Sequence, residues 1–460
     1  MYNCVENTDF RGKSCSVCGI GISNYPLIDF LLSRRASVVA RDRKSEAELS
    51  CAAALRSRGV ELRCGEDYLD DIEEDYIFRA PGIRYDVPGF VRAVERGSIL
   101  TSEMQLFFEL CPCRIIGITG SDGKTTTTTL ISKILEAAGY RVFVGGNIGR
   151  PLLPELGNMT ENDYAVVELS SFQLHTMTLS PDIAVVTNIS PNHLNYHKGM
   201  EEYIAAKENI FTHMRPGGRL VLNAENDYTR DMANRAADGT DLLFFGKGGD
   251  ICERDGYITS GGKRILRCSD ILLPGHHNIE NYMAAVGALR GIVDADAVHT
   301  VAVTFTGVEH RCELVGERNG IKYYNSSIDS SPTRTLEALR NFAPRSIVLI
   351  CGGYDKHIPF EPLAAPICDR VRAAVMTGAT GEEIYKTVET EAERRRGLGE
   401  TVPELYLCPD FDEAVRKAAS VAHCGDVVLL SPACASFDAF PNFEVRGRRF
   451  KALVADIIGN

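Results

Sequence analysis

Short apolar runs rich in Val, Ile and Leu alternate with helical patterns along most of the chain. Strands separated by helices pair in parallel, because each crossover helix returns the chain to the same edge of the sheet. This alternation excludes an all-helical or all-β fold and predicts an α/β protein. The chain has 460 residues, which is enough for about three domains of average size.

Two glycine-rich turns, each between an apolar strand and a helix, divide this pattern into segments. The first, Gly19-Ile-Gly21, opens a βαβ unit, so we expect a Rossmann-like N-terminal domain over residues 1–101. The second follows Thr119 and predicts a central P-loop domain with a mainly parallel sheet over residues 102–307. New apolar strands after residue 320 predict a C-terminal Rossmann-like α/β domain over residues 308–460.

The chain carries 50 basic and 62 acidic residues, for a net charge of −12. An acidic chain offers a poor surface to nucleic acid or to anionic membranes, so we expect neither as a partner and expect anions to bind only at local sites. No apolar stretch approaches the ~18 residues of a membrane span, and the first residues lack a signal-peptide pattern. We therefore expect a cytoplasmic protein without membrane insertion.

The 15 cysteines are expected to be reduced thiols, because their number is odd and several, such as Cys351, lie in apolar strands. Cys15 and Cys18 form a C-x-x-C pair, but no second pair stands at zinc spacing. Both are expected in a core strand.

The strongest local motif is a T-G-x-x-G-K-T run between an apolar strand and an apolar-periodic helix. Backbone N–H groups of such a loop converge on phosphate oxygens, Lys124 would neutralise the terminal phosphates, and the Thr125 hydroxyl can ligate Mg²⁺. The longer G-x-x-x-x-G-K-T form is not matched, because Ile118 occupies its first glycine position. The predicted phosphate-binding residues are Gly120, Ser121, Asp122, Gly123, Lys124, Thr125 and Thr126.

Polar side chains follow two later apolar strands, where ligands bind in open α/β sheets. Glu168 ends one of these runs and can supply the further oxygen ligand that Mg²⁺ needs. His193 follows the next strand, so a contact with the metal or with phosphate is expected there. Lys207 on its own is typical of a solvated lysine on a helix.

Together with Lys207, these motifs resemble the Mur ligases, ATP-dependent enzymes that form amide bonds in peptidoglycan precursor synthesis. The segments that carry the resemblance, in family order, are Thr119–Thr126, Glu168–Ser171, Asn188–His193, Ala206–Lys207, His277–Asn278 and His310–Arg311. The runs Gly352–Lys356 and Leu430–Gly447 resemble the members that add D-glutamate to UDP-N-acetylmuramoyl-L-alanine. The resemblance covers nearly the whole chain and is weakest in the N-terminal third and over residues 227–263.

The resemblance implies that ATP phosphorylates the muramoyl-alanine carboxylate and that the D-glutamate amine then displaces phosphate. It makes the central domain an ATPase domain that uses ATP and two Mg²⁺ ions, with Lys124, His193 and Lys207 as catalytic residues. The implied metal ligands are Thr125, Glu168, His193 and Lys207, where Lys207 is carbamylated by CO₂ to become an oxygen ligand. A monomer is expected, with small-molecule substrates.

The resemblance also assigns contacts to each substrate. For ATP these are Asn278, Asn281, Arg311 and Ser326. For the UDP-linked substrate they are Ile22, Ser23, Asp42, Arg43, Gly82 and, toward the muramoyl group, Asn147. For D-glutamate they are Ser330, Lys356, Ser436 and Phe443.

Five positions depart from the family pattern: Asn24, Asn192, Asn195, Ser326 and Ile328. Asn24 replaces the third glycine of the first turn, and the two later asparagines remove negative charges near the metals. Because of these departures, a second function stays open, that of a non-catalytic nucleotide-binding regulator with the same fold. Another Mur-type or folylpolyglutamate-type amide ligase shares the phosphate loop, and Gly19-Ile-Gly21 alone would fit a nicotinamide oxidoreductase.

Overall fold

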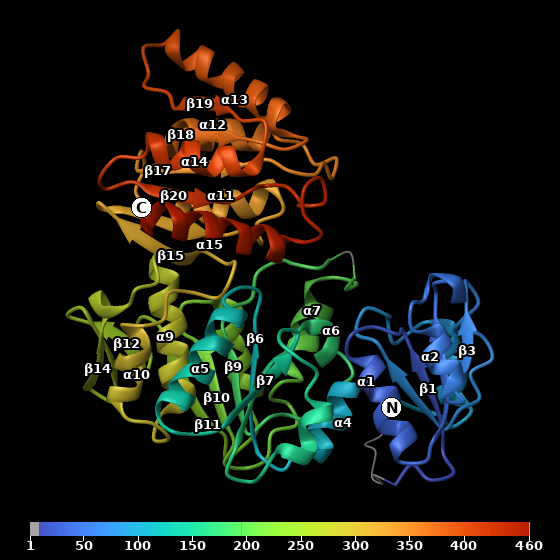
Figure 1. Ribbon diagram of the computed structural model, residues 1–460. Coiled ribbons are helices and arrows are strands. Elements are labelled where there is room, and N and C mark those ends of the chain that lie inside the picture. Colours follow the sequence, from blue (N-terminus) through green and yellow to red (C-terminus); the bar gives the residue numbers. More distant parts are fainter. Residues whose placement is uncertain (1–8, 195, 460) are drawn as a thin grey trace. The chain divides into compact units, whose positions relative to one another are not determined.

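The computed structural model describes residues 9–194 and 196–459 (Figure 1). Over these residues the strands form three sheets, of five, nine and six strands, and helices connect most of the parallel pairs. This arrangement confirms the predicted α/β class.

In the N-terminal sheet, the order is β3-β2-β1-β4-β5 and every neighbouring pair is parallel. Its strands are β1 (Ser14–Cys18), β2 (Ser37–Asp42), β3 (Glu61–Cys64), β4 (Tyr76–Arg79) and β5 (Ile99–Thr101). Its helices are α1 (Asn24–Ser33), η1 (Glu46–Glu48), α2 (Ala52–Ser57) and α3 (Pro88–Glu95). The strand order reverses beside β1, so the loops after β1 and β4 open where such sheets bind ligands.

The central sheet has the order β14-β13-β12-β11-β10-β9-β6-β8-β7. Its strands are β6 (Arg114–Thr119), β7 (Val142–Gly146), β8 (Tyr164–Glu168), β9 (Ile183–Val186), β10 (Arg219–Asn223), β11 (Asp241–Phe245), β12 (Ile251–Arg254), β13 (Tyr257–Ser260) and β14 (Lys263–Arg267). Pairing is parallel from β7 to β12 and antiparallel from β12 to β14. The sheet is therefore mainly parallel, as predicted, with an antiparallel edge.

The helices around this sheet are α4 (Glu103–Leu110), α5 (Lys124–Ala137), η2 (Leu153–Asn158), α6 (Ser171–Leu174), α7 (Met200–Glu208), α8 (Asp227–Met232), η3 (Ala233–Arg235), η4 (Cys268–Asp270), α9 (His276–Leu289) and α10 (Ala295–Ala302). One hydrophobic cluster contains Leu27 and Phe78 of the N-terminal sheet region together with Phe107 and Leu222 of the central region. These two regions therefore share a core.

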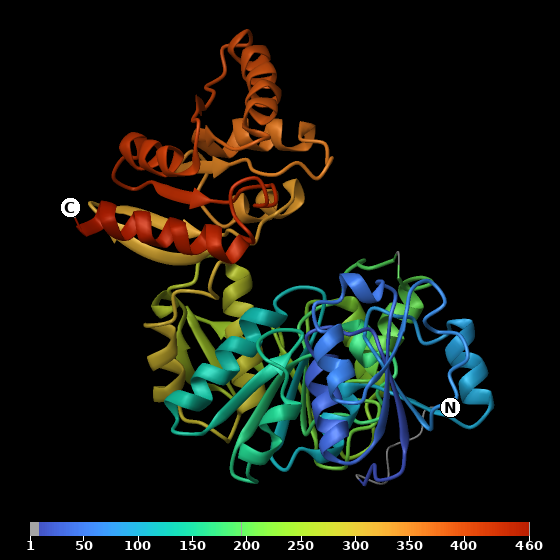
Figure 2. The same cartoon turned by 45° about the vertical axis from the view of Figure 1, so that its right-hand side comes forward.

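The C-terminal sheet has the order β15-β16-β20-β17-β18-β19, antiparallel between β15 and β16 and parallel elsewhere. Its strands are β15 (Glu313–Arg318), β16 (Ile321–Asn325), β17 (Ile347–Cys351), β18 (Val371–Met376), β19 (Glu404–Leu407) and β20 (Val427–Leu430). Its helices are α11 (Pro332–Arg340), α12 (Glu361–Arg370), α13 (Gly381–Arg396), α14 (Phe411–Val421) and α15 (Phe443–Gly459). They cover both faces of the sheet (Figure 2). Neighbouring residues of β17 point to opposite faces, so Leu349 and Val348 belong to different hydrophobic clusters.

The chain divides into two compact units. The first comprises residues 1–270 and 279–302, and the second comprises residues 271–278 and 303–460. Helix α9 thus begins in the second unit and continues in the first. Boundaries at residues 101/102 and 307/308 stay predictions.

Two further expectations concern the whole chain. Among the described residues, none of the helices combines the length and apolar character that a membrane crossing requires. All of the cysteines in the described part of the chain are free, and Cys15 and Cys18 are buried in β1 as predicted.

Candidate active site

The predicted phosphate loop connects β6 to α5. Gly120 and Gly123 have positive φ angles of 148° and 79°. A Cβ at Gly120 would collide with the Thr187 hydroxyl, and one at Gly123 would meet the Asn281 side chain, so both positions require glycine. The first turn of α5 carries neither a side-chain cap nor an acidic residue. Its N–H groups can therefore receive an anion.

Lys124 folds back over this loop. Its Nζ atom donates to the carbonyl oxygens of Gly120 (2.9 Å) and Ser121 (2.8 Å). The ammonium group is thereby held beside the free helix terminus, where terminal phosphates would lie.

Glu168 lies at the end of β8 and is 1% exposed. Its carboxylate accepts a hydrogen bond from the Thr125 hydroxyl (2.8 Å) and another from Asn147 Nδ2 (2.8 Å). Both donors are neutral, and Glu168 forms no ion pair with the described residues. A buried carboxylate beside a hydroxyl oxygen is a donor set suited to Mg²⁺. The residues therefore fit the predicted metal, and Asn147 touches the same carboxylate.

Lys207 of α7 is buried, with 2% of its surface exposed. The expectation from its helical pattern alone, a solvated lysine, is wrong. Its Nζ atom donates to the Gly120 carbonyl (2.7 Å) and the Thr119 hydroxyl (3.2 Å), 4.9 Å from the Tyr203 ring centroid. Burial, together with the charge of Lys124, lowers the pKa of Lys207 well below its usual value. This favours the neutral amine.

His193 lies on the loop that follows β9, with a φ angle of 55°. Its ring packs edge-on against Phe172, with 4.9 Å between ring centroids. Partial burial and the charges of Lys207 and Lys124 lower its pKa, so the imidazole is neutral at neutral pH, the form that binds metals. Asn192 Oδ1 accepts from the His193 N–H (2.8 Å), and Asn195 lies outside the described residues.

The residues predicted to bind the UDP group lie at or after the carboxyl ends of β1, β2 and β4 in the N-terminal sheet. Asp42 accepts hydrogen bonds from the N–H groups of Ile20 (2.8 Å) and Lys44 (3.0 Å), and Ile22 is 83% exposed. Asn24, which replaces a glycine, is buried and donates to the carbonyls of Gly19 and Cys18, so it closes the turn. Ser23 precedes α1, while Arg43 and Gly82 are exposed loop residues.

The second unit brings together residues predicted to bind the amino acid. Lys356 Nζ donates to the carbonyl (3.1 Å) and hydroxyl (3.2 Å) oxygens of Ser330. Ser436 is buried and lies on the loop after β20, whereas Phe443 begins α15.

The residues predicted to bind ATP are divided between the two units. The second unit contains Asn278, Arg311 and Ser326, and the Ser326 hydroxyl accepts a hydrogen bond from the Cys312 N–H. Asn281 belongs to the first unit, where it accepts from the Thr127 hydroxyl.

Two buried arginines with positioning roles are absent from the predicted set. Arg446 is 2% exposed and donates to Ala435 O (2.9 Å) and Cys434 O (3.1 Å), which fixes the loop that carries Ser436. Arg79, 1% exposed, donates to carbonyls after β4 and at α6. The sequence signals that could have identified them are the place of Arg79 at the end of an apolar strand and the place of Arg446 in the C-terminal motif.

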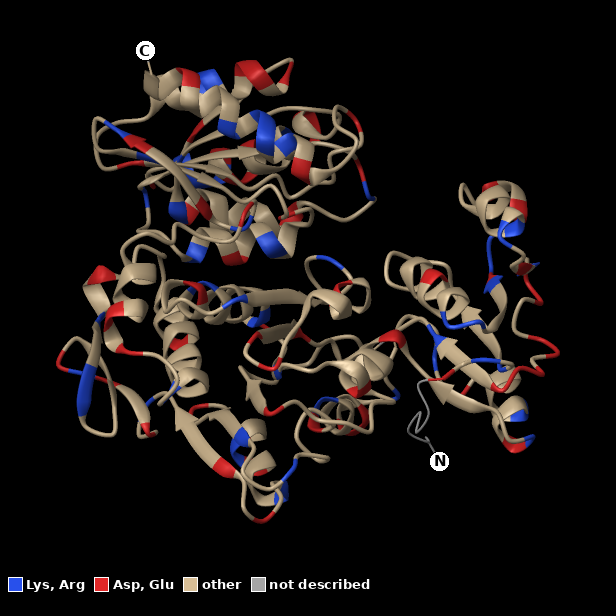
Figure 3. Ribbon diagram, turned by 60° about the horizontal axis from the view of Figure 1, so that its bottom comes forward, with Lys and Arg blue, Asp and Glu red and all other residues tan. Residues whose placement is uncertain are grey.

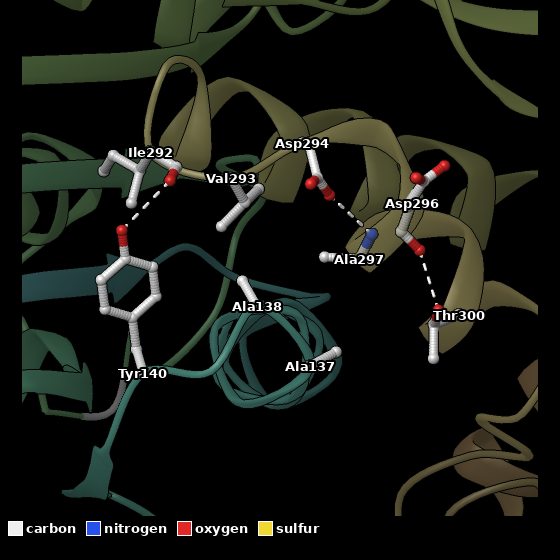
Figure 4. Close-up of a pocket in the computed structure, with 9 residues that line it drawn as sticks. All are labelled: Ala137, Ala138, Tyr140, Ile292, Val293, Asp294, Asp296, Ala297 and Thr300. Carbon is white, nitrogen blue, oxygen red and sulfur yellow. Dashed lines mark hydrogen bonds between the residues drawn. The ribbon is translucent and has the colours of Figure 1, made fainter.

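An open pocket of about 330 Å³ lies between the end of α5 and the connection from α9 to α10 (Figure 4). There the Tyr140 hydroxyl donates to Ile292 O (3.4 Å), and Asp294 accepts from the Ala297 N–H (3.0 Å). No predicted site residue lines this pocket, so it is separate from the candidate active site.

Comparisons with known proteins identify the family of the chain. A family model described as the Mur ligase middle domain matches residues 118–289, and one described as the Mur ligase, glutamate ligase domain matches residues 310–434. The UDP-N-acetylmuramoylalanine--D-glutamate ligase of Acetivibrio thermocellus is 48% identical, over 97% of each chain. The enzyme of that name from Clostridium novyi is also 48% identical, over 98% of this chain and 99% of that one.

Solved structures support the fold. The UDP-N-acetylmuramate-alanine ligase of Thermotoga maritima has a TM-score of 0.57 at 21% identity, covering 97% of this chain and 100% of that chain. A UDP-N-acetylmuramoyl-L-alanyl-D-glutamate--2,6-diaminopimelate ligase has a TM-score of 0.58 at 17% identity, covering 98% and 94%. The near-full-length identity to curated relatives shows that the chain belongs to the Mur ligase family, among the UDP-N-acetylmuramoylalanine--D-glutamate ligases.

Proposed function

We propose that this protein joins D-glutamate to UDP-N-acetylmuramoyl-L-alanine at the expense of ATP, in peptidoglycan precursor synthesis. The observation that carries the proposal is the 48% identity, over 97% of both chains, to a ligase named for this reaction. The free N-terminus of α5 beside Lys124 and the buried Thr125–Glu168 pair support it, because the reaction begins on a nucleotide phosphate.

The reaction needs two bond-forming steps. The alanine carboxylate attacks the γ-phosphorus of ATP, which gives an acyl phosphate and releases ADP. The D-glutamate amine then attacks the acyl carbon, and the tetrahedral intermediate expels phosphate and leaves an amide after the amine loses its proton. Because reactants in the first step are anions, positioning and positive charge provide most of the catalysis.

The chain's own residues meet these needs in the first unit. The N–H groups of Ser121 and Asp122 already donate to Asn188, so those from Gly123 to Thr126 at the start of α5 would hold the phosphates. Lys124 would neutralise charge that moves onto the departing oxygen. Thr125 and Glu168 would hold one Mg²⁺, and His193 and Lys207 a second. When bound, Mg²⁺ supplies positive charge beside the phosphate oxygens.

Lys207 is proposed to react with CO₂. The neutral amine attacks the CO₂ carbon and loses one proton, which converts it into an anionic carbamate with two oxygen ligands. Two features support this step: its burial beside Lys124, which favours the neutral amine, and the mismatch between an ammonium group and a metal ligand.

The Lys207→Ala variant tests the carbamate. Its rate of ADP release should fall at least 100-fold, and added acetate or propionate should restore part of the rate by placing a carboxylate in the vacated space. Exposed Lys133 of α5 provides the control variant, Lys133→Ala, which should retain its rate with or without acetate. Full activity of Lys207→Ala would refute the assignment.

The remaining substrate contacts follow the family pattern. Ile22, Ser23, Asp42, Arg43 and Gly82 would bind the uridine nucleotide, with Asn147 toward the muramoyl group. The adenine and the phosphates of ATP are assigned to Asn278, Asn281 and Arg311, and the ribose is assigned to Ser326. The amino acid is assigned to Ser330, Lys356, Ser436 and Phe443, where the ammonium group of Lys356 pairs with a carboxylate of D-glutamate.

Three further features belong to this proposal. The protein acts as a monomer on small molecules, in the cytoplasm that supplies ATP and UDP-linked precursors. It is organised as domains over residues 1–101, 102–307 and 308–460. Two Mg²⁺ ions participate in each turnover.

The deciding experiment incubates the purified protein with ATP, Mg²⁺, bicarbonate and UDP-N-acetylmuramoyl-L-alanine. D-glutamate, L-glutamate, L-lysine or meso-diaminopimelate is added separately, and ADP and product mass are measured. Turnover with D-glutamate alone is expected. Turnover with another amino acid would keep the ligase but refute the substrate, whereas ATP binding without turnover would support a non-catalytic regulator.

A further inference from the structure

Three sulfur atoms from two distant segments form a chain of contacts where α4 ends and β6 begins, with Cys113 in the middle. Cys111 follows the last residue of α4, and Cys113 precedes the first residue of β6. Their Sγ atoms lie 3.3 Å apart. Met159, which follows η2, places its Sδ atom 3.9 Å from Cys113 Sγ. The cluster therefore combines a vicinal pair of thiols with a thioether.

The chain between the thiols is Pro112, which ends helical pairing because it has no N–H group to donate. The backbone of Cys111 is already extended, with φ −67° and ψ 120°. Cys113 and Met159 are 6% and 7% exposed, while Cys111 is half-buried. An ion can thus approach from the side of Cys111 and meet sulfur ligands held in the protein interior.

The three donors indicate which ion would bind. A thioether takes no part in disulfide formation or in proton transfer, but it is a soft ligand, and mixed thiolate and thioether donors select monovalent copper. Zinc favours four thiolate, imidazole or carboxylate ligands. In the described part of the chain, the one group of at least three such residues is His175, His197 and Glu202, so none joins the two cysteines.

We propose that Cys111, Cys113 and Met159 form a binding site for one monovalent copper ion, with both thiols losing their protons on binding. Three sulfurs at about 2.3 Å from a central ion lie about 4 Å from one another in a trigonal arrangement. Of the three pairs, Cys113 and Met159 already have this separation, the two thiols would move slightly apart from 3.3 Å, and binding would bring Cys111 and Met159 to the same distance. The six residues of β6 separate the site from the phosphate loop, a distance of about 20 Å along the strand.

The test titrates the full-length, reduced protein with Cu(I) under anaerobic conditions, in competition with a chromophoric Cu(I) chelator. The wild-type protein should retain one tightly bound equivalent. Cys113→Ser should lose that equivalent, and Met159→Leu, which conserves volume, should weaken it at least tenfold. Two matched controls, Met177→Leu at another buried methionine and Cys424→Ser at an exposed thiol, should bind like the wild type. Wild-type affinity in Cys113→Ser or in Met159→Leu would overturn the proposal.

A second measurement does not depend on the folding of any variant. X-ray absorption at the copper edge of the wild-type protein with one equivalent of Cu(I) should show three sulfur neighbours. Two sulfur neighbours, or any nitrogen or oxygen neighbour, would overturn the three-sulfur site. Ligase activity of Met159→Leu without copper should equal that of the wild type, because the thioether lies away from the phosphate loop.

Discussion

At the residue scale, two lysines share one carbonyl oxygen. The Nζ atoms of Lys124 and Lys207 both donate to Gly120 O, at 2.9 Å and 2.7 Å. Two ammonium groups this close would repel each other, and burial adds the cost of desolvating a charged Lys207, so the pKa of Lys207 is lowered. Nucleotide phosphates beside Lys124, or a carbamate at Lys207, would each relieve this repulsion. The arrangement therefore favours anionic partners at both lysines.

The Glu168→Gln variant tests the buried carboxylate of this site. The amide loses the negative charge proposed to hold Mg²⁺ but keeps the size of the side chain, so ADP release should fall at least about 100-fold, on the order of 3 kcal/mol in transition-state stabilisation. The free energy of unfolding should change by only about 1 kcal/mol. Activity and urea unfolding are measured together, with Glu136→Gln on the exposed face of α5 as the control. Equal rates in the two variants would exclude Glu168 from the reaction.

A site residue could be predicted from the sequence when its structural partners are close to it along the chain, and could not when they are distant. The phosphate loop is set by seven adjacent residues between a strand and a helix, so its motif identifies it. The burial of Lys207 depends on contacts with Thr119 and Gly120, which stand more than 80 positions earlier in the chain. The residue pattern within α7 cannot predict these contacts. Arg79 likewise depends on partners near position 172. The family resemblance, and not the helical pattern, placed Lys207 among the predicted site residues.

At the element scale, Arg79 at the end of β4 connects two parts of the first unit. Its guanidinium donates to Pro81 O (3.0 Å) and Ile83 O (2.6 Å) in the loop that carries Gly82. It also donates to Phe172 O (3.0 Å) and the Thr176 hydroxyl (3.1 Å). Phe172 in turn packs against His193. One buried side chain thus positions the predicted UDP loop relative to the loop that carries the predicted metal ligand.

Replacing Arg79 with methionine should be severely destabilising. The apolar side chain keeps the length but leaves several buried oxygens without donors, so the free energy of unfolding should fall by about 3 kcal/mol or more. Urea unfolding of Arg79→Met and Arg92→Met provides the comparison. Arg92 forms an exposed ion pair with Asp70, whose loss should cost less than about 1 kcal/mol. Similar losses in both variants would show that Arg79 has no special structural role.

The start of α7 adds an electrostatic link to the same region. Arg84 donates to both carboxylate oxygens of Glu202, at 2.8 Å and 3.2 Å. These hydrogen bonds hold the pKa of Glu202 at about 2, below its ordinary 4.5. A lowered pKa stabilises the fold above pH 4.5, and that contribution is lost as the pH falls from 4.5 to about 2. Solvent screening limits it to about 1 kcal/mol.

This sign predicts how the Glu202→Gln variant responds to acid. Between pH 6 and pH 3, the wild-type urea midpoint should fall further than that of Glu202→Gln, because glutamine has no proton to take up. Glu201→Gln, at the exposed neighbouring position, should follow the wild type. If all three proteins lose the same stability over this interval, the Arg84–Glu202 pair contributes nothing to the acid response.

At the scale of the whole molecule, the sequence predicted the net charge and the fold class better than it predicted which residues form each compact unit. Lys and Arg are interspersed with Asp and Glu over the ribbon (Figure 3), and anion binding at local sites stays a prediction. Strand-and-helix alternation predicted the sheets, but the antiparallel pair β15–β16 joins its strands through a short turn that the parallel pattern did not reveal. The return of residues 279–302 to the first unit depends on packing distant in sequence.

The division into units makes substrate effects separable. The phosphate loop and the predicted UDP contacts lie in the first unit, whereas Lys356 and its partner Ser330 lie in the second. Removing the Lys356 ammonium group should therefore weaken one carboxylate contact with D-glutamate and leave the other substrates unaffected. Lys356→Ala should raise the KM for D-glutamate at least tenfold, about 1.4 kcal/mol or more, with the KM values for ATP and the UDP-linked substrate within twofold of the wild type.

Steady-state kinetics with each substrate varied in turn measures this pattern. Lys386→Ala on α13 is the matched control, because its ammonium group forms an exposed ion pair with Glu382 in the same unit. A parallel rise in all three KM values would indicate a distorted fold instead of a lost contact, and an unchanged KM for D-glutamate would remove Lys356 from the amino-acid site. A selective rise would place carboxylate recognition in the second unit, with phosphate chemistry assigned to the loop between β6 and α5 in the first.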